Sequence, residues 1–150
     1  MSVLEPGCGM GYFTLPIARM TGPEGRVVAV DLQAKMIEGL VRRARRAGLL
    51  ERIEAIVCDD SDLGFTDRAG LIDIALAIHV LHEVRDQQRF LEQVFDALRP
   101  GGRLLILEPK GHVPREKLDG ELALAERVGF HRIDEAVHRR SHGALLEKPA

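Results

Sequence analysis

The sequence predicts a doubly wound α/β fold, in which an open, mostly parallel sheet of seven strands ends in an antiparallel hairpin. Short apolar runs of strand length alternate with segments whose apolar residues recur at helical spacing. The last two runs follow each other with only a short turn between them, which is typical of a hairpin. With 150 residues and no linker or repeat, the chain fits one domain over residues 1–150.

The first half of the chain alternates strand, helix, strand, helix and strand. Buried parallel strands are nearly continuous apolar runs, and the three expected here are Ser2–Glu5, Arg26–Asp31 and Ile53–Val57. A helix is expected from Tyr12 to Met20, because the turn Gly22–Gly25 separates it from the second strand. The next helix carries an apolar stripe from Met36 to Ala47, and Gly48 can end it.

The second half repeats this alternation and adds the hairpin. Asp73–Ile78 is nearly all apolar, as expected of a central strand covered on both faces. The following helix has a buried stripe from Phe90 to Leu98, and Pro100-Gly101-Gly102 is expected to stop it before the strand Arg103–Leu107. Pro114 suits the first turn of a last helix. The expected hairpin strands are His131–His138 and Gly143–Glu147.

Composition argues against several classes of function. The formal net charge is −2, and the chain has no Trp, one Tyr and five Phe, so neither a basic field nor base-stacking aromatic residues indicate a nucleic-acid partner. The longest apolar stretch, Leu71–Leu81, falls short of the roughly 18 residues that span a membrane. Cys8 and Cys58 fit a reducing compartment and show no metal-ligand spacing. We therefore expect a cytoplasmic protein without a membrane span, a nucleic-acid partner or a metal site.

A glycine loop follows the first strand. Gly7, Gly9 and Gly11 stand where a strand passes into a helix, a place where backbone N–H groups meet ligands. A dinucleotide fingerprint would need a third glycine where the chain has Tyr12, and this, with the terminal hairpin, argues against a nicotinamide-dependent oxidoreductase. The alternative role of the glycines is a tight turn without a ligand.

Acidic residues follow the second and third strands. Asp31 lies about twenty residues past the glycine loop, where a carboxylate can accept hydrogen bonds from both hydroxyls of a ribose. Its alternative role is a helix N-cap. Asp59 begins the run Asp59-Asp60-Ser61-Asp62 and could accept a hydrogen bond from an adenine amine, although clustered acids also occur in solvated loops.

These features, together with Leu98-Arg99-Pro100-Gly101-Gly102, closely resemble the class I S-adenosylmethionine-dependent methyltransferases, whose sheet is Rossmann-like. The segments GYFTLPIARMTGPEGRVVAVDLQAKMIE and HVLHEVRD are most similar to the small-molecule branch with ubiquinone/menaquinone C-methyltransferases and arsenite methyltransferases. The resemblance covers nearly the whole chain. One departure is Leu63-Gly64-Phe65, where the family usually has Leu-Pro-Phe.

The resemblance implies S-adenosylmethionine as the cofactor and assigns parts of it to residues. Glu5 and the loop Gly7–Gly11 would hold the methionine part, Asp31 the ribose, Leu32 one face of the adenine, and Asp59 with Asp60 the adenine edge. The implied cofactor-binding set is Glu5, Gly7, Cys8, Gly9, Gly11, Asp31, Leu32, Asp59, Asp60 and Ile78.

The implied activity is transfer of the sulfonium methyl to a small-molecule acceptor by in-line displacement. Positioning the two reactants contributes about 7 to 11 kcal/mol to such a reaction, and only an acceptor that carries a proton needs a base. His79 and His82 lie at the end of the fourth expected strand, and His79 is the candidate catalytic base. Packing at the cleft rim is the commoner role of such a histidine. The sequence leaves open whether carbon, nitrogen, oxygen, sulfur or arsenic is methylated.

The family usually carries some tens of residues before the first strand, which cover the methyl donor, whereas this sequence starts at that strand. We therefore expect either a homodimer or an additional N-terminal segment in the native protein. An alternative function is a donor-binding subunit that is inactive without a partner chain.

Overall fold

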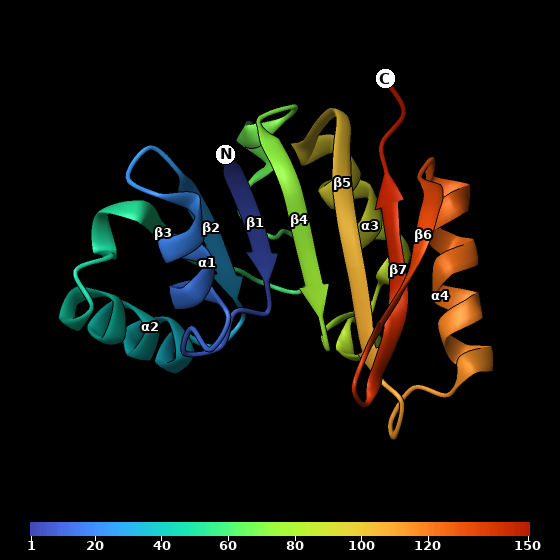
Figure 1. Ribbon diagram of the computed structural model, residues 1–150, viewed down its shortest axis with the longest axis horizontal. Helices are drawn as coiled ribbons and strands as arrows, with labels where there is room; N and C mark the ends of the chain where they lie inside the picture. Colours follow the sequence, from blue (N-terminus) through green and yellow to red (C-terminus); the bar gives the residue numbers. More distant parts are fainter.

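The computed structural model describes residues 1–150 and consists of one sheet between two layers of helices (Figure 1). The seven strands lie in the order β3-β2-β1-β4-β5-β7-β6. β1 to β5 are parallel, and β7 pairs antiparallel with both β5 and β6. The predicted fold class is confirmed. The strands are β1 (Ser2–Pro6), β2 (Arg26–Asp31), β3 (Ile53–Val57), β4 (Ile72–Ile78), β5 (Leu98–Pro109), β6 (His131–His138) and β7 (Ser141–Glu147).

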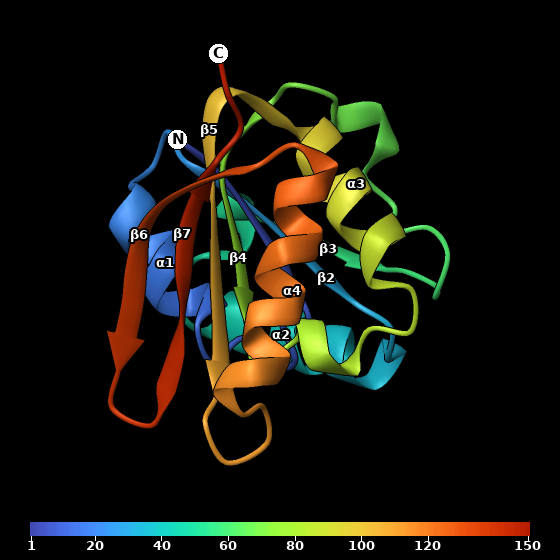
Figure 2. The same cartoon turned by 90° about the vertical axis from the view of Figure 1, so that its right-hand side faces the viewer.

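The helices divide between the two faces of the sheet (Figure 2). They are α1 (Thr14–Thr21), α2 (Ala34–Arg46), α3 (Gln87–Ala97) and α4 (Arg115–Val128), with short 3₁₀ turns η1 (Leu50–Arg52), η2 (Thr66–Arg68) and η3 (Leu81–Glu83). Alternating strand residues face opposite layers: Val3 packs in the apolar cluster of α1 and α2, and Leu4 in the cluster of α3 and α4. No helix has the length and apolar character that a bilayer span requires.

Several element boundaries differ from the prediction, and two of the differences have a clear structural reason. α1 begins at Thr14 rather than Tyr12, because the glycine loop continues through the intervening residues. β5 begins at Leu98, so Pro100-Gly101-Gly102 is a bulge inside the strand and not a stop before it. The bulge stays paired because Gly101 N donates to Lys148 O at 2.8 Å and Lys148 N donates to Gly102 O at 2.8 Å. A contact with the end of the chain therefore extends the strand beyond its apolar run.

One face of β4, β5 and β7 lacks a helical cover (Figure 1). We expected both faces of β4 to be buried, but only Ile72, Ala75 and Ala77, which belong to the core cluster of α3 and α4, are buried. Leu76, Leu105 and Leu145 are cross-strand neighbours on the other face and are half-buried. We call this face the apolar strip, and it consists of Ile74, Leu76, Ile78, Leu105, Leu107 and Leu145.

β6 is the outer strand at one end of the sheet, and nearly all its residues are exposed. Its pairing with β7 shifts register between Arg132 and Asp134. A bulge of this kind interrupts the row of ladder hydrogen bonds.

Candidate functional site

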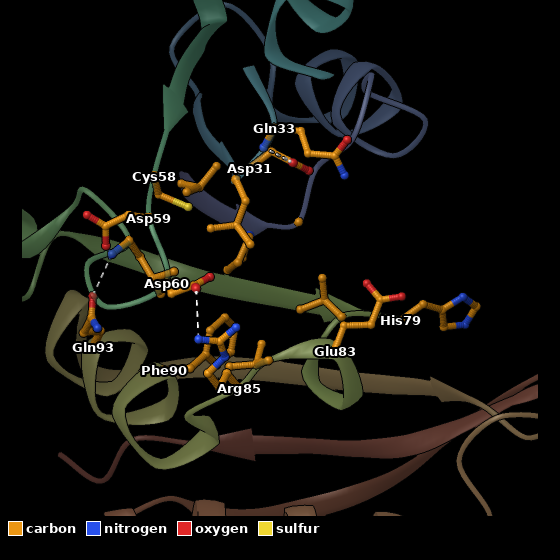
Figure 3. Close-up of a pocket in the computed structure, with 17 residues that line it drawn as sticks. Asp31, Gln33, Cys58, Asp59, Asp60, His79, Glu83, Arg85, Phe90 and Gln93 are labelled. Atoms are coloured by element: carbon orange, nitrogen blue, oxygen red, sulfur yellow. Dashed lines mark hydrogen bonds and ion pairs between the residues drawn. The ribbon is translucent and has the colours of Figure 1, made fainter. Parts of the chain in front are cut away.

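A cavity of about 310 Å³ lies at the carboxyl ends of β1, β2, β3 and β4 (Figure 3). This edge is the usual ligand-binding edge of a doubly wound sheet. Its lining comes from the segments that follow each strand, Pro6–Gly7, Val30–Gln33, Cys58–Asp60 and His79–Val80, and from residues of the η3–α3 region. The volume is in the range of small-molecule sites.

The glycine loop passes close to the end of β4. Gly7 has a φ of +70°, and a Cβ there would lie 1.9 Å from Val80 Cγ2, so a side chain has no room. Gly9 has a φ of +56° and open space where a Cβ would stand. The amides of Gly7 and Cys8 both donate to Val30 O, at 2.7 Å and 3.0 Å. These amides are therefore occupied within the fold, and the loop offers open space above Gly9.

Asp31 fastens the glycine loop to the end of β2. Its Oδ2 accepts from Gly9 N at 2.9 Å, and its Oδ1 accepts from Gln33 N at 2.9 Å. Asp31 is not the N-cap of α2. Gln33 occupies that position, and its side chain makes no capping hydrogen bond. A carboxylate has about four acceptor sites, and two here are used. Asp31 thus keeps acceptor capacity toward the cavity, which it lines next to the 55% exposed Leu32.

Glu5 is buried behind the loop and accepts a hydrogen bond from Thr14 Oγ1. Burial raises the pKa of Glu5 to about 7, although the Thr14 hydrogen bond acts in the opposite direction. A cationic group near Glu5 would favour its ionised form. The sequence did not point to Thr14, whose contact with Glu5 depends on how α1 packs.

In the acidic run after β3, an aspartate side chain accepts hydrogen bonds from the backbone of the same run. Asp59 Oδ1 accepts from Ser61 N at 2.8 Å and from Asp62 N at 2.7 Å, and the Ser61 amide is the largest cause that lowers the pKa of Asp59. Asp60 lies 3.8 Å from Arg85 Nη1 on the other side of the cavity (Figure 3). Asp59 therefore both shapes the loop and lines the cavity.

His79 stands between the cavity and β7. Its φ of +58° is uncommon for a residue with a side chain, and its Nε2 is 2.6 Å from Ser141 Oγ. Burial, and then the nearby His82, lower the pKa of His79, so its ring is neutral around pH 7. In Figure 3 the ring points away from the end of the cavity where Asp59 lies.

Only part of the predicted set lines the cavity. The members that do are Gly7, Asp31, Leu32, Asp59, Asp60 and His79. The members outside the lining are Glu5, Cys8, Gly9, Gly11 and Ile78. The sequence analysis assigned no role to the further lining residues, of which Gln33, Cys58, Glu83, Arg85, Phe90 and Gln93 are labelled in Figure 3. Gln33, Glu83 and Arg85 lie within the two segments that carry the family resemblance. Cys58 could have been found by taking every residue just past a strand end.

A family model described as a methyltransferase domain matches residues 1–138. The chain belongs to this methyltransferase family. The ubiquinone/menaquinone biosynthesis C-methyltransferase UbiE of Pasteurella multocida is 31% identical over 106 residues, which are 71% of this chain and 39% of the relative. The chain thus spans well under half the length of this relative.

Solved methyltransferases share the fold. A SAM-dependent methyltransferase from Aquifex aeolicus superposes with a TM-score of 0.87 at 22% identity, covering 99% of this chain and 82% of the other. The arsenic(III) S-adenosylmethionine methyltransferase CrArsM from Chlamydomonas reinhardtii gives 0.75 at 17% identity, covering 100% and 64%. The predicted resemblance to S-adenosylmethionine-dependent methyltransferases is confirmed.

The residues present fit S-adenosylmethionine, the cofactor that the resemblance to this methyltransferase family implies. Asp31, which keeps free acceptor sites, and the exposed Leu32 line the cavity, and Gly9, with open space where a Cβ would stand, donates its amide to Asp31. No group of three or more His, Cys, Asp or Glu side chains is arranged to hold a metal ion.

Proposed function

We propose that the protein transfers the methyl group of S-adenosylmethionine to a small-molecule acceptor by in-line displacement. The observation that carries this proposal is the cavity at the carboxyl ends of β1–β4, where Asp31 joins the glycine loop to the end of β2 and keeps acceptor sites that a ribose could use. Bound cofactor supplies an activated methyl on a sulfonium, so the protein chiefly has to align the acceptor. The likeness to UbiE proteins supports carbon as the methylated atom.

We assign the parts of the cofactor, and the proton acceptor of the reaction, to residues of this chain as follows. Gly7–Gly11 and Glu5 lie by the methionine part, Asp31 binds the ribose, and Leu32, Asp59 and Asp60 contact the adenine. His79 accepts the proton of an acceptor that carries one, with Ser141 holding its ring.

Titration with S-adenosylhomocysteine and, separately, with NADH in a calorimeter tests the cofactor. We expect saturable binding of S-adenosylhomocysteine and no binding of NADH, because the glycine-loop amides are already bonded to Val30. Methyl release is then measured with S-adenosylmethionine and candidate carbon, oxygen, nitrogen, thiol and arsenite acceptors. NADH binding in place of S-adenosylhomocysteine would refute the proposal.

A second copy of the chain is the occupant that we propose for the apolar strip. Arg103 and Glu147 lie at one end of it, 3.4 Å apart, so a two-fold axis could pair each charge with its opposite on the other copy while the aliphatic residues meet. Light scattering at micromolar concentration is expected to give the mass of a dimer, and Leu105→Lys is expected to give a monomer. A monodisperse monomer of the unsubstituted chain would contradict the proposal.

The alternative function, a donor-binding subunit that is inactive alone, is favoured by the same half-exposed strip. It predicts S-adenosylhomocysteine binding without methyl release from any acceptor tested. A cytoplasmic location is likewise a proposal, which fractionation of the source cells would test.

A further inference from the structure

A cluster of polar side chains lies behind η3, on the side away from the cofactor cavity. Glu108 comes from the end of β5 and is fully buried, and Glu121 comes from α4 and is 5% exposed. The carboxyl groups of these two residues lie in contact, close enough to share a proton. No N–H or hydroxyl group donates to Glu121 Oε1. This contact is satisfied only when one of the two carboxyl groups holds a proton.

This cluster fixes two consecutive residues of η3. Glu108 Oε2 accepts from His82 N at 2.9 Å, and Glu108 Oε1 lies 2.9 Å from His82 Nδ1. Gln87 Nε2 donates to Leu81 O at 2.8 Å and to Glu121 Oε2 at 3.3 Å. The backbone of Leu81 and His82 is therefore held by side chains from β5, α3 and α4.

The segment held in this way forms one wall of the cofactor cavity. His79 and Val80 line the cavity just before η3, and Glu83, Val84 and Arg85 line it just after Leu81 and His82. Figure 3 shows Glu83 and Arg85 projecting from this wall beside the cavity. Displacement of the His82 backbone would move lining residues on both sides of it.

We propose that Glu108 and Glu121, acting through His82, are positioning residues for the wall His79–Arg85, and that their carboxyl–carboxyl contact makes cofactor affinity fall in alkaline solution. The proposal adds two residues, which do not line the cofactor cavity, to the site of the proposed function.

The direction of the effect follows from burial. Burial, and then the contact with Glu108, raise the pKa of Glu121 to about 8, and burial raises the pKa of Glu108 as well. Near pH 7 the pair therefore holds one proton and carries one negative charge. Above pH 8 that proton is lost, and two negative charges meet in a buried contact.

Other titratable groups face this pair from the surrounding elements. His82 and Glu83 belong to η3, and His79 precedes it. The ring of His112, between β5 and α4, stacks on His82 at 6.4 Å. Glu116 and Lys117 of α4 line a cavity of about 520 Å³ together with His82 and Glu121. Of the groups near the pair, Glu121 is the one whose pKa is raised to about 8, by burial and then by the contact with Glu108.

Calorimetric titration of the full chain with S-adenosylhomocysteine at pH 7 and pH 9 tests this inference. Glu121→Gln keeps the shape of the side chain, and its amide donates to Glu108 as the protonated acid does. From pH 7 to pH 9 we expect the affinity of the unsubstituted protein to fall roughly fivefold or more relative to this variant. Ionisation of the ligand and of Glu5 between pH 7 and pH 9 affects the unsubstituted protein and Glu121→Gln equally, so it cancels when the two proteins are compared. Glu116→Gln, which removes an exposed acid from the same cavity, is expected to behave as the unsubstituted protein.

Parallel loss of affinity in the unsubstituted protein and Glu121→Gln would overturn the proposal. Hydrogen exchange of the His82 amide is a second test of the proposal, and it needs no variant. After correction for the intrinsic rate, its protection is expected to fall roughly tenfold between pH 7 and pH 9. The Lys148 amide, which donates to Gly102 O at 2.8 Å and lies outside this wall, is the internal control. Unchanged protection of His82 would refute the inference, whereas absence of cofactor binding at every pH would refute the proposed function.

Discussion

Asp31→Ala is expected to weaken the binding of S-adenosylmethionine and S-adenosylhomocysteine by roughly thirtyfold to a thousandfold. The substitution removes a charged acceptor of two ribose hydroxyls, a loss on the order of 2 to 4 kcal/mol. It also removes the acceptor of Gly9 N, so the glycine loop loses its attachment to the end of β2. Calorimetric titration with S-adenosylhomocysteine measures the effect.

Two variants give this measurement its controls. Asp31→Asn keeps an oxygen for Gly9 N but removes the charge, so its affinity is expected to lie between those of the unsubstituted protein and Asp31→Ala. Glu38→Ala removes an exposed acid from α2 and is expected to leave affinity unchanged. An affinity loss below about threefold in Asp31→Ala would contradict the ribose assignment.

Replacement of His79 is expected to lower turnover on the order of a hundredfold to ten-thousandfold when the acceptor carries a proton of high pKa. Donor affinity should stay nearly constant, because the His79 ring points away from the end of the cavity where Asp59 lies (Figure 3). His79→Asn is preferable to His79→Ala, since asparagine tolerates the φ of +58° better than alanine. Steady-state kinetics at saturating acceptor, with His138→Ala as an exposed control, provide the measurement.

Two further results would qualify the role of His79. The neutral form of a base is the active one, and burial lowers the pKa of His79, so the contribution of His79 to turnover is expected to be lost as the solution becomes acidic. Unchanged turnover in His79→Asn would remove the residue from the mechanism and leave alignment as the main contribution.

The fold could be predicted because strand and helix periodicities are local properties of the sequence. The glycine loop and Asp31 could be placed for the same reason, since both lie just past a strand end. The assignment of roles to the cofactor-binding residues and to His79 stays a prediction. The partners of these residues could not be predicted: Asp31 meets Gly9, and His79 meets Ser141, only through the packing of the sheet.

Long-range pairing also explains the remaining differences. The bulge at Pro100-Gly101-Gly102 depends on Lys148, close to the other end of the chain. The contact between Glu108 and Glu121 joins β5 to α4, and no spacing in the sequence indicates it. Arg85 lines the cavity because η3 directs the chain across it. Each of these contacts is set by tertiary geometry, which a single sequence read for periodicity does not contain.

The register shift in β6 lowers the tendency of the molecule to aggregate through that edge of its sheet. An outer strand with free N–H and C=O groups can template the addition of a strand from another molecule. Here Arg132, Asp134 and Glu135 place charges along that strand, and the shift between Arg132 and Asp134 breaks its ladder. Growth of the sheet into a fibril through β6 is thereby opposed, so on this side of the molecule assembly of copies is favoured across the face of the sheet rather than along its edge.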